Sequence, residues 1–376
     1  MRNPYFVSRP YSCEFIEGER SAERLRRTGS NTGNLLFIHA LKRVVRHERY
    51  SCGVKLNPSS VREQHDGLIV PAANWLKPNA ALGKLAHLVE SSKLPCVMVG
   101  LGAQATSYDR VPALDEGTVR LVRVIAERSH SISVRGQFSA EVLNHYGVKN
   151  VTVTGCPSML WQVRAPVAVR RNGTDRPARV TVGTSRAGTT ELIRTQTVRN
   201  RLSILLSAAA MKHGWDYVAQ TEVHDIGVAT SEISDAAGRE QAAEYLRLAF
   251  QTSDDSAISD YLQRHLKVFF RIPDWLDYAV TRDFIFGTRL HGVIIGLIAG
   301  VPSLLLTHDT RTEEAAQWMG LPSVSATTVL QAKKLDLQRL YESIDLDSLN
   351  SRMQKYYAEF RRFFELNNVE TNLVTT

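Results

Sequence analysis

Residues 283–311, with the sequence DFIFGTRLHGVIIGLIAGVPSLLLTHDTR, constrain the fold more than any other part of the chain. Residues 284–286 are a short apolar run bounded by glycine, which is typical of a buried strand. Thr288 is expected to cap the helix that follows, and residues 294–299 of that helix are apolar on every side, so the helix should be buried. A Gly-Val-Pro turn ends it, and residues 303–306 predict a second buried strand. A buried strand–helix–strand unit predicts an α/β fold.

Two polar residues stand at the start of this buried helix, just past the end of a strand. Open α/β sheets bind their ligands at this position. The helix end offers unpaired N–H groups to an anion, and Arg289 adds a planar cation suited to phosphate or carboxylate. His291 adds a group that moves a proton near neutral pH. The alternative is structural: His291 caps a core contact, and Arg289 pairs with a structural carboxylate.

The composition is that of a globular protein with two domains. The chain has 376 residues, of which 43% are hydrophobic and 22% charged, and this length is too great for one ordinary core. Lys+Arg 46 against Asp+Glu 38 gives a net charge of +8. That balance fits an anionic substrate or membrane surface, and equally fits no special partner. The chain has no dense basic run with interleaved aromatics, so nucleic acid is not an expected partner.

The cysteines point to a reducing compartment rather than to a metal or a disulfide framework. They are scattered and form no CxxC pair: Cys13, Cys52, Cys96 and Cys156. No cluster has metal-ligand spacing, so no metal is expected. The N-terminus lacks an apolar signal segment, and the longest apolar run is too short to span a bilayer. A cytoplasmic location is expected, with any membrane association peripheral.

Strands alternate with helices in both halves of the chain, which predicts two doubly wound domains whose strand ends face a central cleft. The expected domains are 1–165 and 175–345, with an Arg-, Pro- and Gly-containing linker at 165–179 and a C-terminal helix within 346–376 whose aromatics pack in the core. Residues 17–27 are expected to be helical or mobile. The further expected strands are 5–7, 68–70, 96–100, 131–134, 151–154, 180–183, 215–219 and 268–271. The expected helices are 33–46, 80–91, 118–127, 137–146, 197–212, 240–250, 257–265 and 273–279.

Two loops in the first half suit the close approach of a ligand. The first contains small polar residues around a glycine: Ser30, Asn31, Thr32, Gly33 and Asn34. The second lies in VMVGLGAQAT at 97–106, where Gly100 and Gly102 are expected to let backbone N–H groups come close to a ligand. This loop is not a GxGxxG or Walker motif, so it does not indicate a dinucleotide or ATP. An ordinary loop and helix cap is the alternative for the first stretch.

Arg135 follows the strand at 131–134 and precedes a helix, the same position that Arg289 takes in the second half. The strand at 151–154 ends in Gly155-Cys156-Pro157-Ser158. Cys156 is either a reactive thiol or, as we expect, a buried small residue.

Several of these segments together resemble the polysaccharide pyruvyl transferase family. They are GTRLHGVIIGLIAGVPSLLL, SVRGQFSAEVLNHYGVKNVTVTGCPS, VGLGAQ and NTGNLLF, which occur in order over residues 28–312. The resemblance implies a GT-B-like fold of two Rossmann-like domains. It also implies an enzyme that moves the enolpyruvyl group of phosphoenolpyruvate onto a sugar, usually as a cyclic ketal, with release of phosphate. The sequence departs from many relatives in having Cys156, and Asn31 or Thr32, where they have acidic residues.

The resemblance implies that Arg135, Arg289 and His291 are the key residues. Phosphoenolpyruvate carries a carboxylate and a phosphate, so two arginines and a helix N-terminus form a suitable cradle. His291 is the candidate acid/base; the helix dipole lowers its pKa and a bound phosphate raises it. The expected substrate-binding residues are Asn31, Thr32, Gly33, Asn34, Gly100, Gly102, Gln104, Pro157, Ser158, Thr288, Leu290 and His308.

The expected partners are phosphoenolpyruvate and a sugar acceptor, either free or lipid-linked at the inner face of the membrane, with no cofactor. The pattern sets no oligomeric state. One alternative is a GT-B glycosyltransferase that uses a sugar nucleotide and holds the ribose through Glu313 or Glu314. Another is a non-catalytic relative that kept only the fold.

Overall fold

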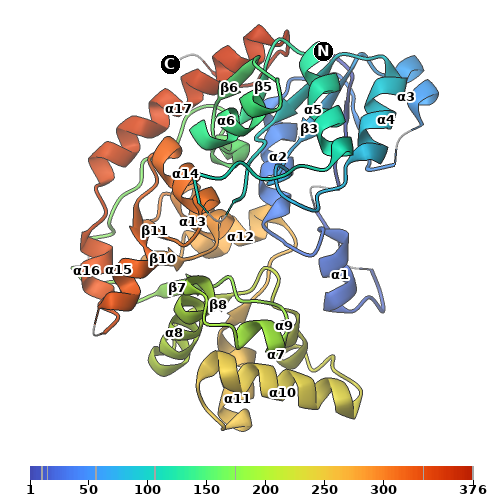
Figure 1. Ribbon diagram of the computed structural model, residues 1–376. Coiled ribbons are helices and arrows are strands. Elements are labelled where there is room, and N and C mark those ends of the chain that lie inside the picture. The colour runs from blue at the N-terminus through green and yellow to red at the C-terminus, as the bar shows by residue number, and fades with distance from the viewer. Residues whose placement is uncertain are drawn as a thin grey trace.

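The computed structural model describes residues 1–9, 12–14, 16–55, 57–105, 107–173, 175–332 and 334–374. Thr106, at the end of the second expected ligand loop, lies outside them. Strands form the centre of each half, and helices cover both faces (Figure 1). No helix in the described ranges is both long and apolar enough to cross a membrane.

The first domain is built on a parallel sheet with the strand order β2-β1-β3-β4. A parallel bridge between Leu101 and Val134 extends it to the pair β5-β6. Its strands are β1 Pro4–Phe6, β2 Ser51–Cys52, β3 Gly67–Pro71, β4 Cys96–Val99, β5 Ile132–Val134 and β6 Val151–Val153. Its helices are α1 Ser21–Arg27, α2 Asn34–Val44, α3 Pro58–Gln64, α4 Gly83–Ser92, α5 Glu116–Arg128 and α6 Gln137–His145, followed by the 3-10 helix η1 Pro157–Trp161.

The second domain has a parallel sheet with the order β12-β11-β10-β7-β8-β9. Its strands are β7 Val180–Gly183, β8 Asp216–Val218, β9 Leu266–Lys267, β10 Phe284–Gly287, β11 Ser303–Thr307 and β12 Ser323–Ser325. The chain runs from β7 outward to β8 and β9, then returns to the other side of β7 at β10. Ligands bind at such a reversal, beyond the carboxyl ends of the two central strands. The expected fold of two Rossmann-like domains is confirmed.

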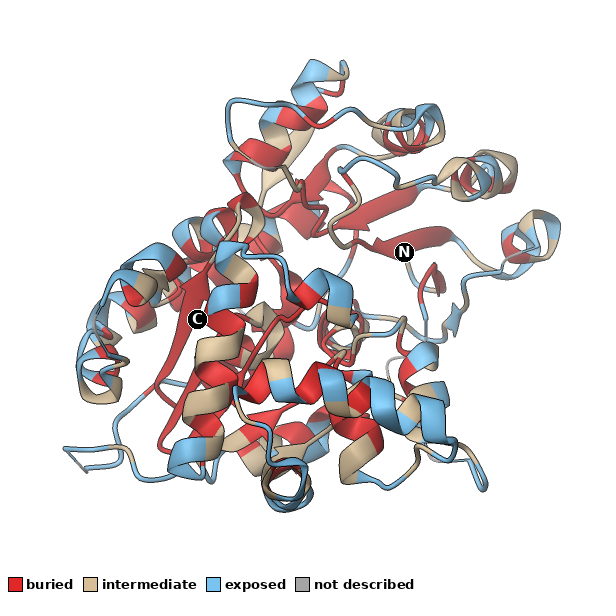
Figure 2. Ribbon diagram, turned by 60° about the horizontal axis from the view of Figure 1, so that its bottom comes forward, coloured by how far each residue is buried: buried red, intermediate tan, exposed pale blue. Residues whose placement is uncertain are grey.

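Helices of many lengths surround this second sheet. They are α7 Thr190–Ile193, α8 Val198–His213, α9 Val223–Ala229, α10 Ala236–Phe250, α11 Asp255–His265, α12 Ile272–Ala279, α13 Leu290–Ile298, α14 Thr310–Met319, α15 Ala326–Gln331, α16 Leu337–Glu342 and α17 Leu346–Leu366. Residues 293–298 of α13 are all buried, as their uniformly apolar character predicts. Figure 2 shows the strands and the inward helix faces as the buried part of the molecule.

Two segments tie the domains together. Helix α17 runs along both domains (Figure 1) and donates from Tyr356 Oη to the Cys156 carbonyl oxygen at 2.5 Å. The segment between β1 and α2 crosses in the other direction: Cys13 N donates to Phe270 O at 3.1 Å, and Ser21 Oγ donates to the Glu232 carboxylate at 2.9 Å. Each contact joins residues far apart in sequence, so the relative placement of the domains is held at several points.

The structure corrects two local predictions in the second domain. The strand expected at 268–271 is Leu266–Lys267, because these two residues pair with Tyr217 and Val218 at the edge of the sheet. Thr288 is not the cap of α13. Its backbone N–H donates to Gly183 O at 2.9 Å, which keeps Thr288 in the strand-to-helix turn and makes Arg289 the N-cap residue.

Candidate functional site

His291 lies in the first turn of α13, where the two domains meet. Its ring faces Phe37 of α2, with 5.6 Å between ring centroids, and its Nε2 lies 3.7 Å from Cys156 Sγ. Gly33 is pressed against the same imidazole: a Cβ there would lie 3.0 Å from His291 Cβ and Nδ1 and 2.5 Å from Gln220 Oε1. The imidazole is half-buried rather than sealed in the core. Glycine at position 33 is therefore what lets the first domain approach His291.

The surroundings of His291 favour its neutral form. Burial lowers the pKa of the imidazole to about 3, and the positive charges of Arg135 and Arg311 act in the same direction. At neutral pH the free protein therefore holds His291 unprotonated. A bound dianion beside these cations would reverse the effect, because negative charge stabilises the imidazolium.

Arg289 is held by both sides of the strand reversal. Its Nε donates to the Thr184 carbonyl oxygen, just past β7, at 2.5 Å. Its Nη2 contacts Thr221 Oγ1 and pairs with the carboxylate of Glu222, beyond β8. The structural alternative for Arg289 is thus partly correct, because it does pair with a buried carboxylate. The pairing orients the guanidinium without placing it in the core.

Glu222 is a residue that sequence reasoning missed. It is buried, and its carboxylate also accepts from the backbone N–H groups of Gln220 at 2.8 Å and Thr221 at 2.9 Å. Burial alone raises the pKa of this carboxyl, but Arg289, Arg186 and the two backbone donors outweigh it and hold the pKa below its ordinary value. Glu222 is therefore charged at neutral pH and fixes Arg289.

The Glu222→Gln substitution is expected to reduce the free energy of unfolding by about 1–2 kcal/mol, since a charged hydrogen bond becomes a neutral one. Chemical denaturation measures the change. The double variant Glu222→Gln/Arg289→Met should recover part of the stability, because no charge is then left unpaired. A double variant less stable than the sum of the single changes would contradict the assigned pairing.

Arg135 closes the facing edge of the first sheet. It is buried, and it donates from Nε to Gly100 O at 2.9 Å and from Nη1 to Asn74 Oδ1 at 3.1 Å. A third contact joins Nη2 to Ala72 O at 3.4 Å. The guanidinium thus hydrogen-bonds to residues just past the ends of both β3 and β4. These contacts leave part of its five-donor capacity for a ligand.

Arg311, in the first turn of α14, links the two expected arginines. Burial lowers its pKa; Asp309, 3.4 Å away, opposes the change, while Arg135 and Arg289 add to it. The charge of Arg311 therefore interacts with both guanidinium groups, one from each domain. The sequence offered a signal, since Arg311 follows a buried strand as Arg289 does. We name the four residues Arg135, Arg289, His291 and Arg311 the cationic cluster.

Several buried polar atoms around the cationic cluster have no hydrogen-bond partner among the residues that the structure describes. They are Thr32 Oγ1, Gln220 Nε2, Thr288 Oγ1 and Arg311 Nε. Thr32, Gln220 and Thr288 each expose 1% or less of their surface. Buried polar groups are normally satisfied, and their collection at one place is the mark of a site that a ligand completes. Both domains contribute, since Thr32 comes from the first.

The remaining expected binding residues divide into three groups. Gly100 and Gly102 pack against the site from the first domain: a Cβ on Gly100 would meet Pro157, and one on Gly102 would meet Arg135. Their own N–H groups are not offered to a ligand, because Gly100 N donates to Ser133 Oγ at 2.9 Å and Gly102 N to Ala73 O at 3.0 Å. Ser158 Oγ lies 3.2 Å from Cys156 Sγ, and Cys156 itself is buried, as expected.

The second group turns away from a ligand. Asn31 Oδ1 accepts from Gly33 N at 2.9 Å, and Asn34 Nδ2 donates to Thr28 O at 3.0 Å. These two side chains shape the loop.

The third group, in which each residue has contacts within the protein, is Gln104, Leu290 and His308. Leu290 packs against the core, the Gln104 backbone N–H donates to Leu76 O, and the buried His308 ring lies 3.8 Å from Asp309.

Acid should destabilise the protein through its buried histidines. Burial lowers the pKa of His308 to about 4, and that of His291 is about 3, against 6.5 in an unfolded chain. Below pH 6.5 each histidine takes up a proton on unfolding. The free energy of unfolding is therefore highest above pH 6.5, and it falls by about 1.4 kcal/mol per pH unit per histidine as the pH drops to about 4. Denaturation of wild type and His308→Gln at several pH values measures the difference. The exposed His87→Gln is the control; equal slopes for wild type and His308→Gln would contradict the assignment.

The comparison with known proteins decides the family. The family model described as polysaccharide pyruvyl transferase matches residues 31–310. The chain belongs to this family. The matched range begins at Asn31 and ends at Thr310, so it contains Arg135, Arg289 and His291. This is a transferase family, and the chain is a member of it.

Other comparisons add no argument about activity. No curated protein matches the chain. The S. aureus MnaA–UDP structure aligns with 100% of this chain and 98% of its own, at 12% identity and a TM-score of 0.44. UDP-N-acetylglucosamine 2-epimerase from Rickettsia bellii aligns with 97% of this chain and 96% of its own, at 11% identity and a TM-score of 0.44. A glycotransferase of kitacinnamycin covers 96% of this chain and 85% of its own, at 13% identity and a TM-score of 0.36.

Among the described residues of this pyruvyl transferase family member, no group of three or more His, Cys, Asp and Glu side chains is placed to hold a metal ion.

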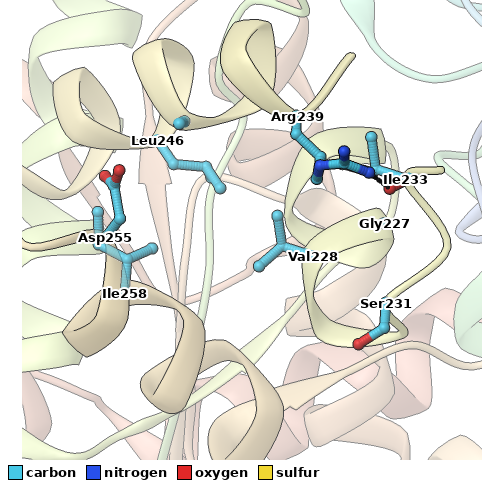
Figure 3. Close-up of a pocket in the computed structure, with 9 residues that line it drawn as sticks. Gly227, Val228, Ser231, Ile233, Arg239, Leu246, Asp255 and Ile258 are labelled. Atoms are coloured by element: carbon cyan, nitrogen blue, oxygen red, sulfur yellow. Dashed lines mark hydrogen bonds between the residues drawn. The ribbon is translucent and has the colours of Figure 1, made fainter. Parts of the chain in front are cut away.

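A further hollow lies apart from the cationic cluster. A hollow of about 420 Å³ lies between α9, α10 and α11, with Val228, Leu246 and Ile258 turned into it (Figure 3). The hollow shares no lining residue with the cationic cluster.

Proposed function

We propose that the protein transfers the enolpyruvyl group of phosphoenolpyruvate to a sugar of a polysaccharide or its precursor, forming a pyruvate ketal and releasing phosphate. The observation that carries the proposal is the cationic cluster, in which the charge of Arg135 from one domain acts on His291 and Arg311 from the other, and Arg289 adds a further cation. Membership of the polysaccharide pyruvyl transferase family supports it. Three guanidinium groups with two neighbouring carboxylates, Glu222 and Asp309, leave a positive site for a small anion.

The donor carries two anionic groups, and the cluster has two kinds of partner for them. Arg289 stands at the N-terminus of α13, where unpaired backbone N–H groups add to its charge. Arg311 and Arg135 approach from the other side. We assign the phosphate and the carboxylate to these two arms, which holds C2 and C3 of the donor near the imidazole.

His291 then moves the protons. The phosphate raises its pKa from the low value of the free protein, so the imidazolium forms once the donor is bound. It gives its proton to C3 of the enol, and C2 becomes an oxocarbenium-like centre. A sugar hydroxyl forms the new O–C2 bond and returns a proton to His291. The C2–O bond to phosphate breaks, and a second hydroxyl closes the ketal and loses its proton to the departing phosphate.

The proposed location follows from the donor and the acceptor. Phosphoenolpyruvate is a cytoplasmic metabolite in this scheme, and we place the protein in the cytoplasm. If the acceptor is lipid-linked, the protein works at the inner face of the membrane as a peripheral protein. No cofactor enters any step of the scheme.

Two measurements test the proposal. Phosphate release from phosphoenolpyruvate should depend on added acceptor when free and lipid-linked glycans are screened. Phosphoenolpyruvate should raise the melting temperature, whereas UDP and GDP should not. Stabilisation by a nucleotide alone would favour the sugar-nucleotide glycosyltransferase. Glu314, one expected ribose partner there, is already engaged, because its carboxylate accepts from Ser139 N at 2.7 Å and Oγ at 3.0 Å.

A further inference from the structure

A hollow of about 620 Å³ lies between the two domains, beside the cationic cluster. The first domain supplies Tyr108 and the start of α6, and the second supplies α14 and α17. Nothing in the proposed chemistry uses this space. Its lining is mixed and includes aromatic rings, amides and carboxylates.

The aromatic part has the shape that sugar rings require. Tyr108 meets Phe138 edge to face, with ring centroids 5.3 Å apart at 87°. Trp318 lies across the hollow and is only partly buried. A pyranose presents a face of C–H groups, which packs on an aromatic ring, and a perimeter of hydroxyls. Large flat side chains on both walls therefore suit a ring-shaped polyol.

The polar part excludes an anion and favours a neutral ligand. Glu141 and Glu314 both line the hollow. Among the described residues that line it, the one cation is Arg352. It is already paired, since its Nη1 and Nη2 donate to the Glu359 carboxylate at 2.8 and 2.9 Å. Gln137 and Gln317 are exposed at the edge and offer amides to hydroxyl groups. The charge of this hollow is thus opposite to that of the cationic cluster.

The hollow adjoins the cationic cluster through two walls. Glu314 contacts Ser139, and it fills the space beside Gly136, which follows Arg135 directly. Tyr108 Oη donates to the carbonyl oxygen of Thr310, which precedes Arg311, at 3.1 Å. Each wall is therefore one residue from an arginine of the cluster. A glycan lying in the hollow has its next sugar close to the donor.

We propose that this hollow is a subsite for a neutral sugar of the acceptor glycan, next to the sugar that receives the pyruvyl group. The assignment of the glycan as an acceptor rests on the proposed function. The subsite itself rests on the lining and stands without it. It makes the protein prefer an oligosaccharide acceptor to a monosaccharide.

Binding is tested without turnover, in the His291→Gln background. The probes are neutral tetrasaccharides that end in galactose, mannose or N-acetylglucosamine, observed by saturation-transfer NMR. At least one should receive saturation from the protein, and Trp318→Ala should weaken its binding at least 10-fold. Because Trp318→Ala removes a partly buried ring, a second variant changes only the exposed pair, Gln317→Ala/Glu141→Ala, and should weaken binding at least 3-fold.

The control is Glu116→Gln, an exposed carboxylate on α5 outside the hollow, which should bind as the parent does. A circular dichroism spectrum and a melting temperature equal to those of the parent show that the variants are folded. If no tetrasaccharide binds, or if both hollow variants bind as tightly as the parent, the subsite is overturned. Binding that depends on Trp318, combined with no phosphate release by the protein that keeps His291, would support the subsite and reject pyruvyl transfer.

Discussion

The His291→Gln protein is expected to release phosphate from phosphoenolpyruvate about 10²–10⁴-fold more slowly than wild type at saturating donor and acceptor, the range that positioned acid/base groups contribute. Glutamine keeps a polar side chain of similar size, so the contacts with Phe37 and Gly33 persist while proton transfer is lost. A coupled phosphate assay measures kcat, and the KM for phosphoenolpyruvate should change far less.

The control for this result is His87→Gln, on the exposed side of α4. Circular dichroism and the melting temperature should match wild type in both proteins. A His291→Gln protein that retains the wild-type kcat would remove His291 from the mechanism. The pH profile is a second check, because kcat of wild type should fall at high pH as the donor-bound imidazolium loses its proton.

Local sequence rules predicted the part of the site that lies at strand ends. Arg135, Arg289 and His291 were found because each follows a short buried strand and precedes or begins a helix. In a parallel sheet that position lies at the ligand-binding edge. Gly33 was found as a small residue at the start of a helix, although the reason it must be small, the imidazole beside it, is visible only in the structure.

The rest of the site depends on contacts between distant residues. Glu222 and Gln220 lie after β8, in a segment with no periodic apolar pattern. Glu222 pairs with Arg289, which is 67 positions later in the chain. Asn31 and Asn34 have the composition of ligand contacts, yet their side chains bond within their own loop. Thr288 was expected as a cap, but the turn after β10 uses its backbone and leaves its hydroxyl for a ligand.

The Arg311→Met protein should bind phosphoenolpyruvate about 10- to 100-fold more weakly, since a charged hydrogen bond is worth about 1.5–3 kcal/mol and each 1.4 kcal/mol is tenfold in affinity. The free energy of unfolding of the Arg311→Met protein distinguishes a role of Arg311 in binding the donor from a role in stabilising the fold. Burial and the like charges of Arg135 and Arg289 lower the pKa of Arg311, so the free protein disfavours this cation. Removing it should leave the free energy of unfolding unchanged or raise it, as is typical of residues kept for function.

Calorimetry with phosphoenolpyruvate and denaturant unfolding measure the two quantities on the same sample. Arg110→Met, an exposed arginine, is the matched control and should change neither. An Arg311→Met protein that binds phosphoenolpyruvate normally and unfolds more easily would make Arg311 a structural partner of Asp309. We expect weaker binding without loss of stability. The cations of this site repel one another in the free protein, the two domains hold them together, and the substrate neutralises them.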